Sequence, residues 1–160
     1  MKRLYACFVR SKLEYCSAVW CGASPRCLKR LERIQMQIAR AFSRVRPASA
    51  ALSAAGLPTL AWRRREHCLL LLWKLVNSQG QPQLEALLPA TASSRSVSSL
   101  RSAHSLEFSL SSSSRHLSSF FCVTIPLWNA LPTHVVSCSA SSFCSAVLKH
   151  FCNDKFSFGL

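Results

Sequence analysis

The sequence predicts a mainly α-helical protein: a small helical bundle of about four helices with a serine-rich flexible loop and a short plug that contains proline and tryptophan. Apolar residues recur at spacings of three and four in several segments, which is the period of one helix face. Proline, glycine and serine punctuate the chain between these segments. Hydrophobic residues make up 49% of the 160 positions, which is enough to bury one modest core.

The first predicted helix runs from Lys2 to about Val19. Its apolar positions have mixed three and four spacing, namely Leu4, Tyr5, Phe8, Val9, Leu13, Cys16 and Val19. Gly22 marks its end. Ser24 then favours an N-cap and Pro25 a first helical residue, so a second helix is predicted over residues 26–44.

The second predicted helix separates apolar from basic side chains. At about 100° per residue, one face carries Leu28, Leu31, Ile34, Ile38 and Phe42. The opposite face carries Arg26, Arg30, Arg33, Gln37, Arg40 and Arg44. Guanidinium groups in such a row suit a phosphate backbone. An ordinary solvated face is the alternative, but such a face normally mixes charge signs, and here only Glu32 interrupts.

Residues 45–58 are predicted to connect this helix to a third one. Within the connector, Ala48–Ala55 favours a short helical piece that Gly56 ends. The third helix opens at Leu57-Pro58-Thr59 and ends near Asn77. Its first turns carry Arg63, Arg64 and Arg65, which fan around the axis and cannot all point one way. Its leucines, Leu69 to Leu72, cover the whole circumference, so burial on more than one face is expected.

Two further regions follow the basic helical region 1–80. Residues 81–119 form a predicted flexible segment, because the serine-rich stretch Ser93–Ser119 has too few large apolar groups to offset its ordering entropy. Strand-like patches are conceivable near Leu106–Leu110. Residues 120–160 form the third region, in which Pro126 and Pro132 predict a short helical turn or an extended plug whose Trp128 docks on a core. A last helix is predicted over Ser139–Phe151, with Phe143, Val147 and Phe151 at helical spacing.

The charge is strongly one-sided. The formal net charge is +14, because 20 lysines and arginines face only six carboxylates. Residues 1–75 hold 15 of the basic and three of the acidic groups. A field of this sign attracts an RNA or DNA backbone without regard to base sequence, in preference to an anionic membrane or to no partner at all. The predicted contacts are Arg26, Arg30, Arg33, Arg40, Arg44, Arg63, Arg64 and Arg65.

No catalytic residue, cofactor or metal is predicted. Two-metal nucleotidyl transfer needs converging carboxylates, and the only aspartate is Asp154. The four glycines form no phosphate loop. Two sets of residues are candidate zinc ligands, Cys16, Cys21 and Cys27 in one and Cys138, Cys144, His150 and Cys152 in the other. Neither contains a C-x-x-C pair, so a metal-binding module is only a minor alternative.

The nine cysteines predict free thiols in an intracellular compartment, either nuclear or cytoplasmic. Their number is odd, and several occupy apolar positions of helical patterns. No membrane association is predicted either, since the longest strongly apolar run, Cys68–Val76, contains Lys74 and is far shorter than the roughly 20 residues of a span. The oligomeric state stays open.

Several short motifs occur in a fixed order along the chain. They are Leu4-Tyr5, Phe8-Val9-Arg10, Leu13-Glu14-Tyr15-Cys16, Val19-Trp20, Leu31-Glu32-Arg33-Ile34-Gln35, Ala39-Arg40, Gly56-Leu57-Pro58-Thr59-Leu60, Arg63-Arg64-Arg65, Leu127-Trp128-Asn129-Ala130-Leu131-Pro132, Val135-Val136 and Phe143. In order and spacing they resemble the C-terminal region that follows the palm in reverse transcriptases of jockey- and CR1-like non-LTR (LINE-type) retrotransposons. The resemblance covers residues 4–151.

The resemblance implies a thumb or post-thumb scaffold that contacts template RNA and primer, detached from the palm of the RNA-directed DNA polymerase. It implies a fragment that is not an enzyme alone, with a polymerase core as a conceivable partner in trans. Ser11 stands where the family commonly has proline and Cys21 where it has aspartate, which indicates a decayed or truncated copy. A decayed transposon-derived reading frame with no biochemical activity is therefore the alternative.

Overall fold

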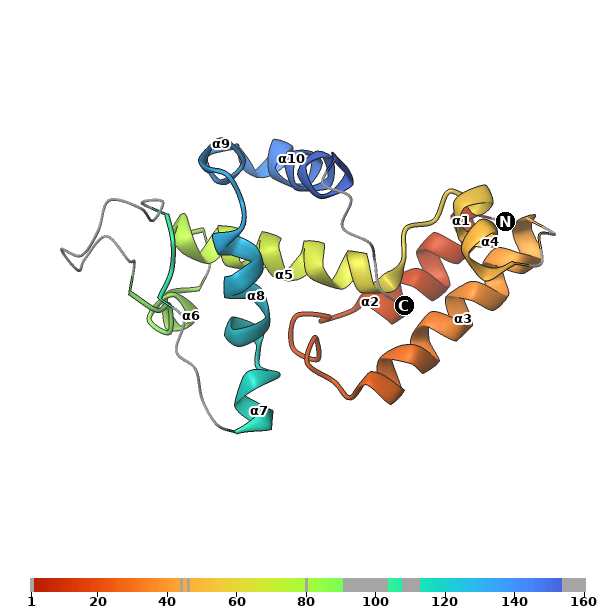
Figure 1. Ribbon diagram of the computed structural model, residues 1–160, viewed down its shortest axis with the longest axis horizontal. Helices are drawn as coiled ribbons and strands as arrows, with labels where there is room; N and C mark the ends of the chain where they lie inside the picture. The colour runs from red at the N-terminus through yellow and green to blue at the C-terminus, as the bar shows by residue number, and fades with distance from the viewer. Residues whose placement is uncertain are drawn as a thin grey trace. The chain divides into compact units, whose positions relative to one another are not determined.

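The computed structural model describes residues 2–43, 45, 47–79, 81–90, 104–107 and 113–153. These residues are mainly helical, which confirms the predicted fold class (Figure 1). The chain divides into two compact units, an N-terminal unit, Met1–His67, and a C-terminal unit, Cys68–Leu160. The boundary falls within helix α5, Leu60–Val76. The predicted three-region division at residues 80 and 119 stays a prediction.

The first helix is shorter than predicted. It comprises α1 (Lys2–Leu4), the wider turn η1 (Tyr5–Arg10) and α2 (Ser11–Glu14), which follow one another directly. It ends because Tyr15 is extended, with ψ at 129°, and Cys16 has a positive φ of 49°. The prediction that it reaches Val19 was wrong. Val19 is 86% exposed, so no tertiary packing stabilises a helix that continues to this residue.

Helix α3, Pro25–Ser43, confirms the second predicted helix. The Ser24 hydroxyl accepts a hydrogen bond from the Cys27 amide at 3.4 Å, as expected of an N-cap. The buried face differs from the predicted one, because its centre lies at Gln35 and Ala39, which are 1% and 0% exposed. Ile34, assigned to that face from the sequence, is 41% exposed.

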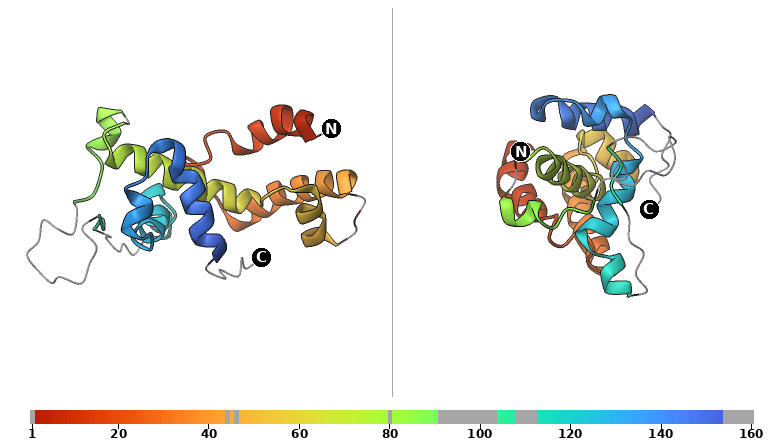
Figure 2. Two further views of the ribbon diagram at one scale, coloured as in Figure 1. Left: turned by 90° about the horizontal axis from the view of Figure 1, so that it is seen from above. Right: turned by 90° about the vertical axis from the view of Figure 1, so that its left-hand side faces the viewer.

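Helix α4, Ala48–Ala55, confirms the short helical piece within the connector. Gly56 ends it in the left-handed region, with φ at 63°, where glycine has no Cβ to clash. Ala51 and Ala55 pack with Ala39 of α3, and these small side chains let the two helices come close, as Figures 1 and 2 show. Val45, Leu52 and Leu57 cover the edges of this cluster.

Helix α5 confirms the third predicted helix. In the C-terminal unit its Cys68, Leu69, Leu72, Trp73 and Leu75 are buried, and Leu70 and Leu71 are half-buried. These positions spread widely around the helix axis, as its leucine pattern predicted. Helix α5 is therefore the central element of the core of this unit.

The region predicted to be flexible contains packed structure. Residues 82–85 form the single turn α6 (Pro82–Glu85), and residues 114–117 form α7 (Ser114–Leu117). Leu106 is only 4% exposed. The side chain of Asn129 accepts a hydrogen bond from the Leu106 amide at 2.9 Å and donates one to its carbonyl at 3.0 Å. The flexibility of the segment 81–119 stays a prediction, and residues 91–103 and 108–112 lie outside the described part.

The predicted plug is a regular helix, α8 (Phe120–Asn129), with Pro126 inside it. The proline lacks an amide hydrogen and so forgoes one backbone hydrogen bond. Burial of Ile125 and Trp128, which are 2% and 0% exposed, offsets the lost hydrogen bond. The spacing of the prolines in the sequence does not reveal this burial. The docking of Trp128 on a core is confirmed. The description as a short turn or an extended plug was wrong.

Two helices complete the C-terminal unit. The single turn α9 (Thr133–Val136) was not predicted, whereas α10 (Ala140–Asn153) confirms the last predicted helix. Phe143 of α10 lies with its ring centroid 5.7 Å from that of Trp73 and 6.3 Å from that of Trp128. The Trp73 indole donates to the Val136 carbonyl at 3.0 Å. The core therefore joins α5, α8, α9 and α10.

Candidate nucleic-acid interface

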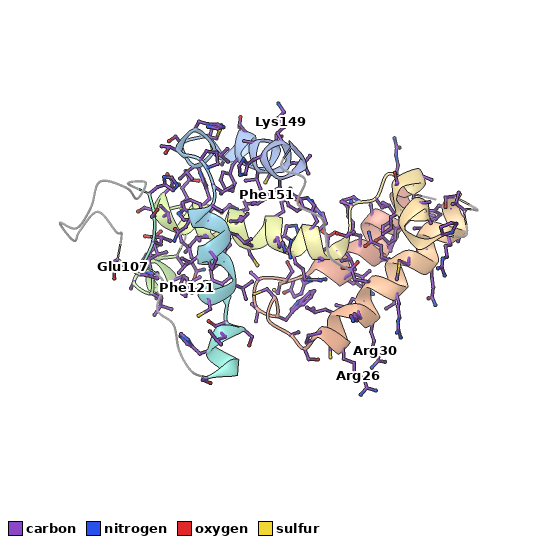
Figure 3. All side chains as sticks on the ribbon, viewed as in Figure 1. Arg26, Arg30, Glu107, Phe121, Lys149 and Phe151 are labelled. Carbon is purple, nitrogen blue, oxygen red and sulfur yellow. The ribbon has the colours of Figure 1, made fainter. Side chains whose placement is uncertain are left out.

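Four exposed arginines line one side of α3. Arg26, Arg30, Arg33 and Arg40, here called the arginine stripe, follow one another at intervals that return to the same side of a helix. The rise of an α-helix gives the stripe a length of about 21 Å. Figure 3 shows Arg26 and Arg30 pointing outward from the N-terminal half of α3. Arg44, which the sequence also assigned to this row, lies outside the described residues.

The stripe is not neutralised by neighbouring carboxylates. None of the ion pairs found within the described ranges includes a stripe arginine. The three carboxylates in the sequence of the N-terminal unit, Glu14, Glu32 and Glu66, are each paired with other arginines. The acidic groups of this unit are therefore engaged internally, and the stripe presents its charge to solvent.

Arg63 is engaged within the fold. Its Nε and Nη2 donate to the two carboxylate oxygens of Glu14 at 3.2 and 2.9 Å, and its Nη1 donates to Glu66 at 2.7 Å. The hydrogen bonds that it donates to Glu14 raise the pKa of the guanidinium above its ordinary value. Arg63 was predicted as a nucleic-acid contact, and in the structure its side chain joins α5 to α2 through Glu14.

Arg64 and Arg65 diverge, as neighbours on a helix must. Arg64 is 7% exposed, its Nη2 lies 3.4 Å from Glu32 Oε1, and its Cζ lies 5.8 Å from the centroid of the Trp20 ring. A cation over an aromatic face is attracted by the negative face of the ring. Arg65 is exposed. Of the three consecutive arginines predicted as contacts, only Arg65 faces solvent fully.

Glu32 has a structural role that the sequence pattern did not reveal. Its carboxylate accepts hydrogen bonds from the Leu60 and Ala61 amides at 3.2 and 2.6 Å, at the positive N-terminus of α5. The Thr59 hydroxyl accepts from the Trp62 amide at 3.2 Å. These three contacts satisfy the first amides of α5. The only sequence signal was the N-cap threonine, because the partner carboxylate is 28 residues away.

Gln35 lies one turn after Glu32 and also contacts the chain ahead of α5. Its side-chain amide donates to the Pro58 carbonyl at 2.8 Å while the residue is almost fully buried. Together Glu32 and Gln35 fix the start of α5 against α3. This is the physical reason why the buried face of α3 centres on a glutamine.

His67 joins a polar cluster with α2. Its Nδ1 lies 3.0 Å from Ser17 Oγ, and its Nε2 lies 3.3 Å from Arg63 Nη2 and 3.7 Å from Glu14 Oε2. Burial and the positive charge of Arg63 lower the pKa of His67. Although a serine, a histidine and a carboxylate meet here, Ser17 is 2% exposed, so its hydroxyl is closed to a substrate.

The cysteines do not assemble a metal site within the described ranges. Among these residues, no three His, Cys, Asp or Glu side chains come close enough to hold an ion. None of the eight described cysteines forms a disulfide. Cys152, a member of the second candidate set, is not among them. Across the described residues, each helix is too short or too polar to cross a bilayer.

Comparisons with known proteins add no relative. No family model matches the chain, and no curated protein or solved structure is significantly similar to it.

Proposed function

We propose that this chain is a thumb or post-thumb fragment of a reverse transcriptase of the non-LTR retrotransposon type, and that it contacts RNA or DNA backbones through the arginine stripe. The fragment has no polymerase activity of its own. DNA synthesis would belong to a polymerase core in a separate chain. The observation that carries the proposal is the unpaired stripe on one side of α3.

The contacts between motif segments support the proposed ancestry. Glu14, in the motif Leu13-Glu14-Tyr15-Cys16, is the bidentate partner of Arg63 in the three-arginine motif. Glu32 and Gln35, in the second motif region, bind the Gly56–Leu60 segment. Motifs that lie far apart in the sequence thus provide each other's hydrogen-bond partners. Such contacts agree with residues that belong to one ancestral fold.

In the C-terminal unit the motif residues bond to residues outside the motifs. Trp128, in the Leu127–Pro132 motif, donates its indole hydrogen to the His104 carbonyl at 3.0 Å, and the adjacent Asn129 pins Leu106 through two bonds. The carbonyl of Val136, in the next motif, accepts from Trp73. The motif residues therefore have scaffolding roles, which agrees with a non-catalytic region of a larger enzyme.

The stripe would bind by displacing counterions from phosphates. Each arginine that neutralises a phosphate releases condensed cations, so binding gains entropy and does not depend on base identity. The stripe is all guanidinium, and a guanidinium can donate two parallel hydrogen bonds to one phosphate. The glutamates of the N-terminal unit are engaged with Arg63 and Arg64 and are not free to bind a metal ion for nucleotidyl transfer.

A charge-matched pair of variants tests the proposal. In the stripe variant, Arg26, Arg30, Arg33 and Arg40 are replaced by glutamine. In the control variant, four exposed cations from other helices are replaced, namely Arg3, Lys12, Lys74 and Lys149. Both lose four positive charges. Filter binding to an RNA of mixed sequence at low salt is expected to weaken at least about tenfold more in the stripe variant than in the control.

Circular dichroism of both variants checks that the helices remain, since exposed substitutions of this kind change stability by about 0.5 kcal/mol or less each. Equal losses in the two variants would mean that only net charge matters, and the stripe would then not be a site. No binding by the unaltered chain would favour the alternative, a decayed reading frame without activity.

A further inference from the structure

The His67 cluster joins the turn between α2 and α3 to α5. The turn covers residues 15–22 and is anchored locally by the Trp20 indole, which donates to the Tyr15 carbonyl at 2.8 Å. A side-chain hydrogen bond between Ser17 and His67 joins this turn to α5, and the Arg64 guanidinium of α5 also lies 5.8 Å from the centroid of the Trp20 ring. A change in the state of His67 therefore acts directly on the attachment of the turn.

The neighbours of His67 assign the tautomer of its ring. Arg63 has only hydrogen-bond donors, so His67 Nε2 must be the acceptor in the 3.3 Å contact with Arg63 Nη2. Nδ1 then carries the hydrogen and donates it to Ser17 Oγ at 3.0 Å. Both contacts are satisfied only by the neutral ring with its proton on Nδ1.

A second proton on the His67 ring would place a positive charge next to that of Arg63. Protonated Nε2 has no lone pair to accept from Arg63, and the imidazolium would face the guanidinium at hydrogen-bond distance. Arg63 is held by three charge-assisted hydrogen bonds, two that it donates to Glu14 and one that it donates to Glu66. His67 is held by one hydrogen bond to a hydroxyl, and its Nε2 lies 3.7 Å from Glu14 Oε2, beyond hydrogen-bond distance. Charge-assisted bonds are the stronger kind, so His67 is the side chain that moves.

We propose that His67 is an acid-sensitive latch, which ties the Tyr15–Gly22 turn to α5 while its ring is neutral and releases the turn when the ring takes up a proton. The latch is independent of the stripe, since no stripe arginine belongs to the cluster. It uses residues from η1, α2, the turn and α5.

The charged groups around the latch oppose one another. Arg63 and, more weakly, Arg10 of η1 disfavour a second proton, whereas Glu14 of α2 and Glu66 of α5 favour it. Burial lowers the pKa of His67 further than either arginine does, and that pKa in the fold lies below its ordinary value of 6.5. The folded chain thus binds this proton less well than the unfolded chain. Stability is full above pH 6.5 and falls as the pH drops below that value toward the folded pKa.

Nuclear magnetic resonance of the full chain across a pH series tests the latch. The imidazole signals of His67 are expected to titrate with a midpoint below 6.5, and the amide signals of Ser17 and Val19 are expected to shift with the same midpoint. In His67→Gln, the glutamine amide can donate to Ser17 and accept from Arg63 but cannot titrate. Its turn amides should not shift at that midpoint, whereas the exposed control His134→Gln should behave as the unaltered chain does.

Two results would overturn the latch. One is a His67 midpoint at or above 6.5, because the neutral ring would then not be the favoured state in the fold. The other is a His67 titration that leaves the Ser17 and Val19 amides unmoved, because protonation would then not reach the turn. Both are read from the unaltered chain, so they stand even if His67→Gln folds poorly.

Discussion

Replacing Glu32 by alanine is expected to destabilise the N-terminal unit by about 3 kcal/mol. The substitution removes the acceptor of the Leu60 and Ala61 amides and the charge partner of Arg64. The side chains of Glu32 and Arg64 are 19% and 8% exposed, so water screens their charges only partly. A loss of this size is a large share of the stability of a small unit.

Urea denaturation of the full chain, followed by circular dichroism and by hydrogen exchange of the α3 amides, measures this loss. Glu32→Gln keeps an oxygen acceptor and should lose less, about 1 to 2 kcal/mol. Arg33→Ala, at the adjacent and exposed position, is the control and should change stability by about 0.5 kcal/mol or less. If Glu32→Ala behaved like that control, the capping of α5 by Glu32 would be refuted.

Truncating Trp128 to alanine is expected to have a comparable or larger effect on the C-terminal unit, about 3 to 5 kcal/mol. The side chain is fully buried, lies against Phe143 and donates to the His104 carbonyl. Its removal leaves a large cavity and an unpaired carbonyl. We expect the backbone amides of α8 and α10 to exchange their hydrogens faster in this variant, and their lost protection measures the lost stability.

One further substitution separates the packing of Trp128 from its hydrogen bond, and a second one is a control. Trp128→Phe keeps most of the apolar contact and loses the indole hydrogen bond, so about 1 to 3 kcal/mol should be lost. Leu148→Ala removes a side chain that is 43% exposed on α10, and a loss below about 1 kcal/mol is expected. Equal losses for Trp128→Ala and Leu148→Ala would show that Trp128 does not organise this core.

Elements with a strong local signal were predicted well. Periodicity and caps placed α3, α4, α5 and α10 within about two residues of their observed ends. Errors arose where long-range contacts outweigh local preference. Pro126 argued against a helix, yet burial of Trp128 keeps α8 regular. Leu106 lies in a serine-rich stretch, and the sequence pattern did not reveal that Asn129, 23 residues away, binds its backbone.

The candidate site was predicted in part for the same reason. The helical period identified the exposed arginines of α3, because their positions depend only on local geometry. In the sequence, Arg63 and Arg64 look like additional nucleic-acid contacts. Their carboxylate partners, Glu14 and Glu32, lie 49 and 32 residues away along the chain. Charge counting cannot show which cations are neutralised inside a fold. That requires the contacts themselves.

The salt dependence of nucleic-acid binding tests the central claim most directly. For the unaltered chain and a duplex DNA, we expect the logarithm of the binding constant to fall linearly with the logarithm of salt concentration. Four neutralised phosphates correspond to a slope of about −3 to −4, with duplexes of different sequence giving the same line. A slope near zero, or no binding at about 50 mM salt, would contradict the claim that the arginine stripe binds phosphate backbones.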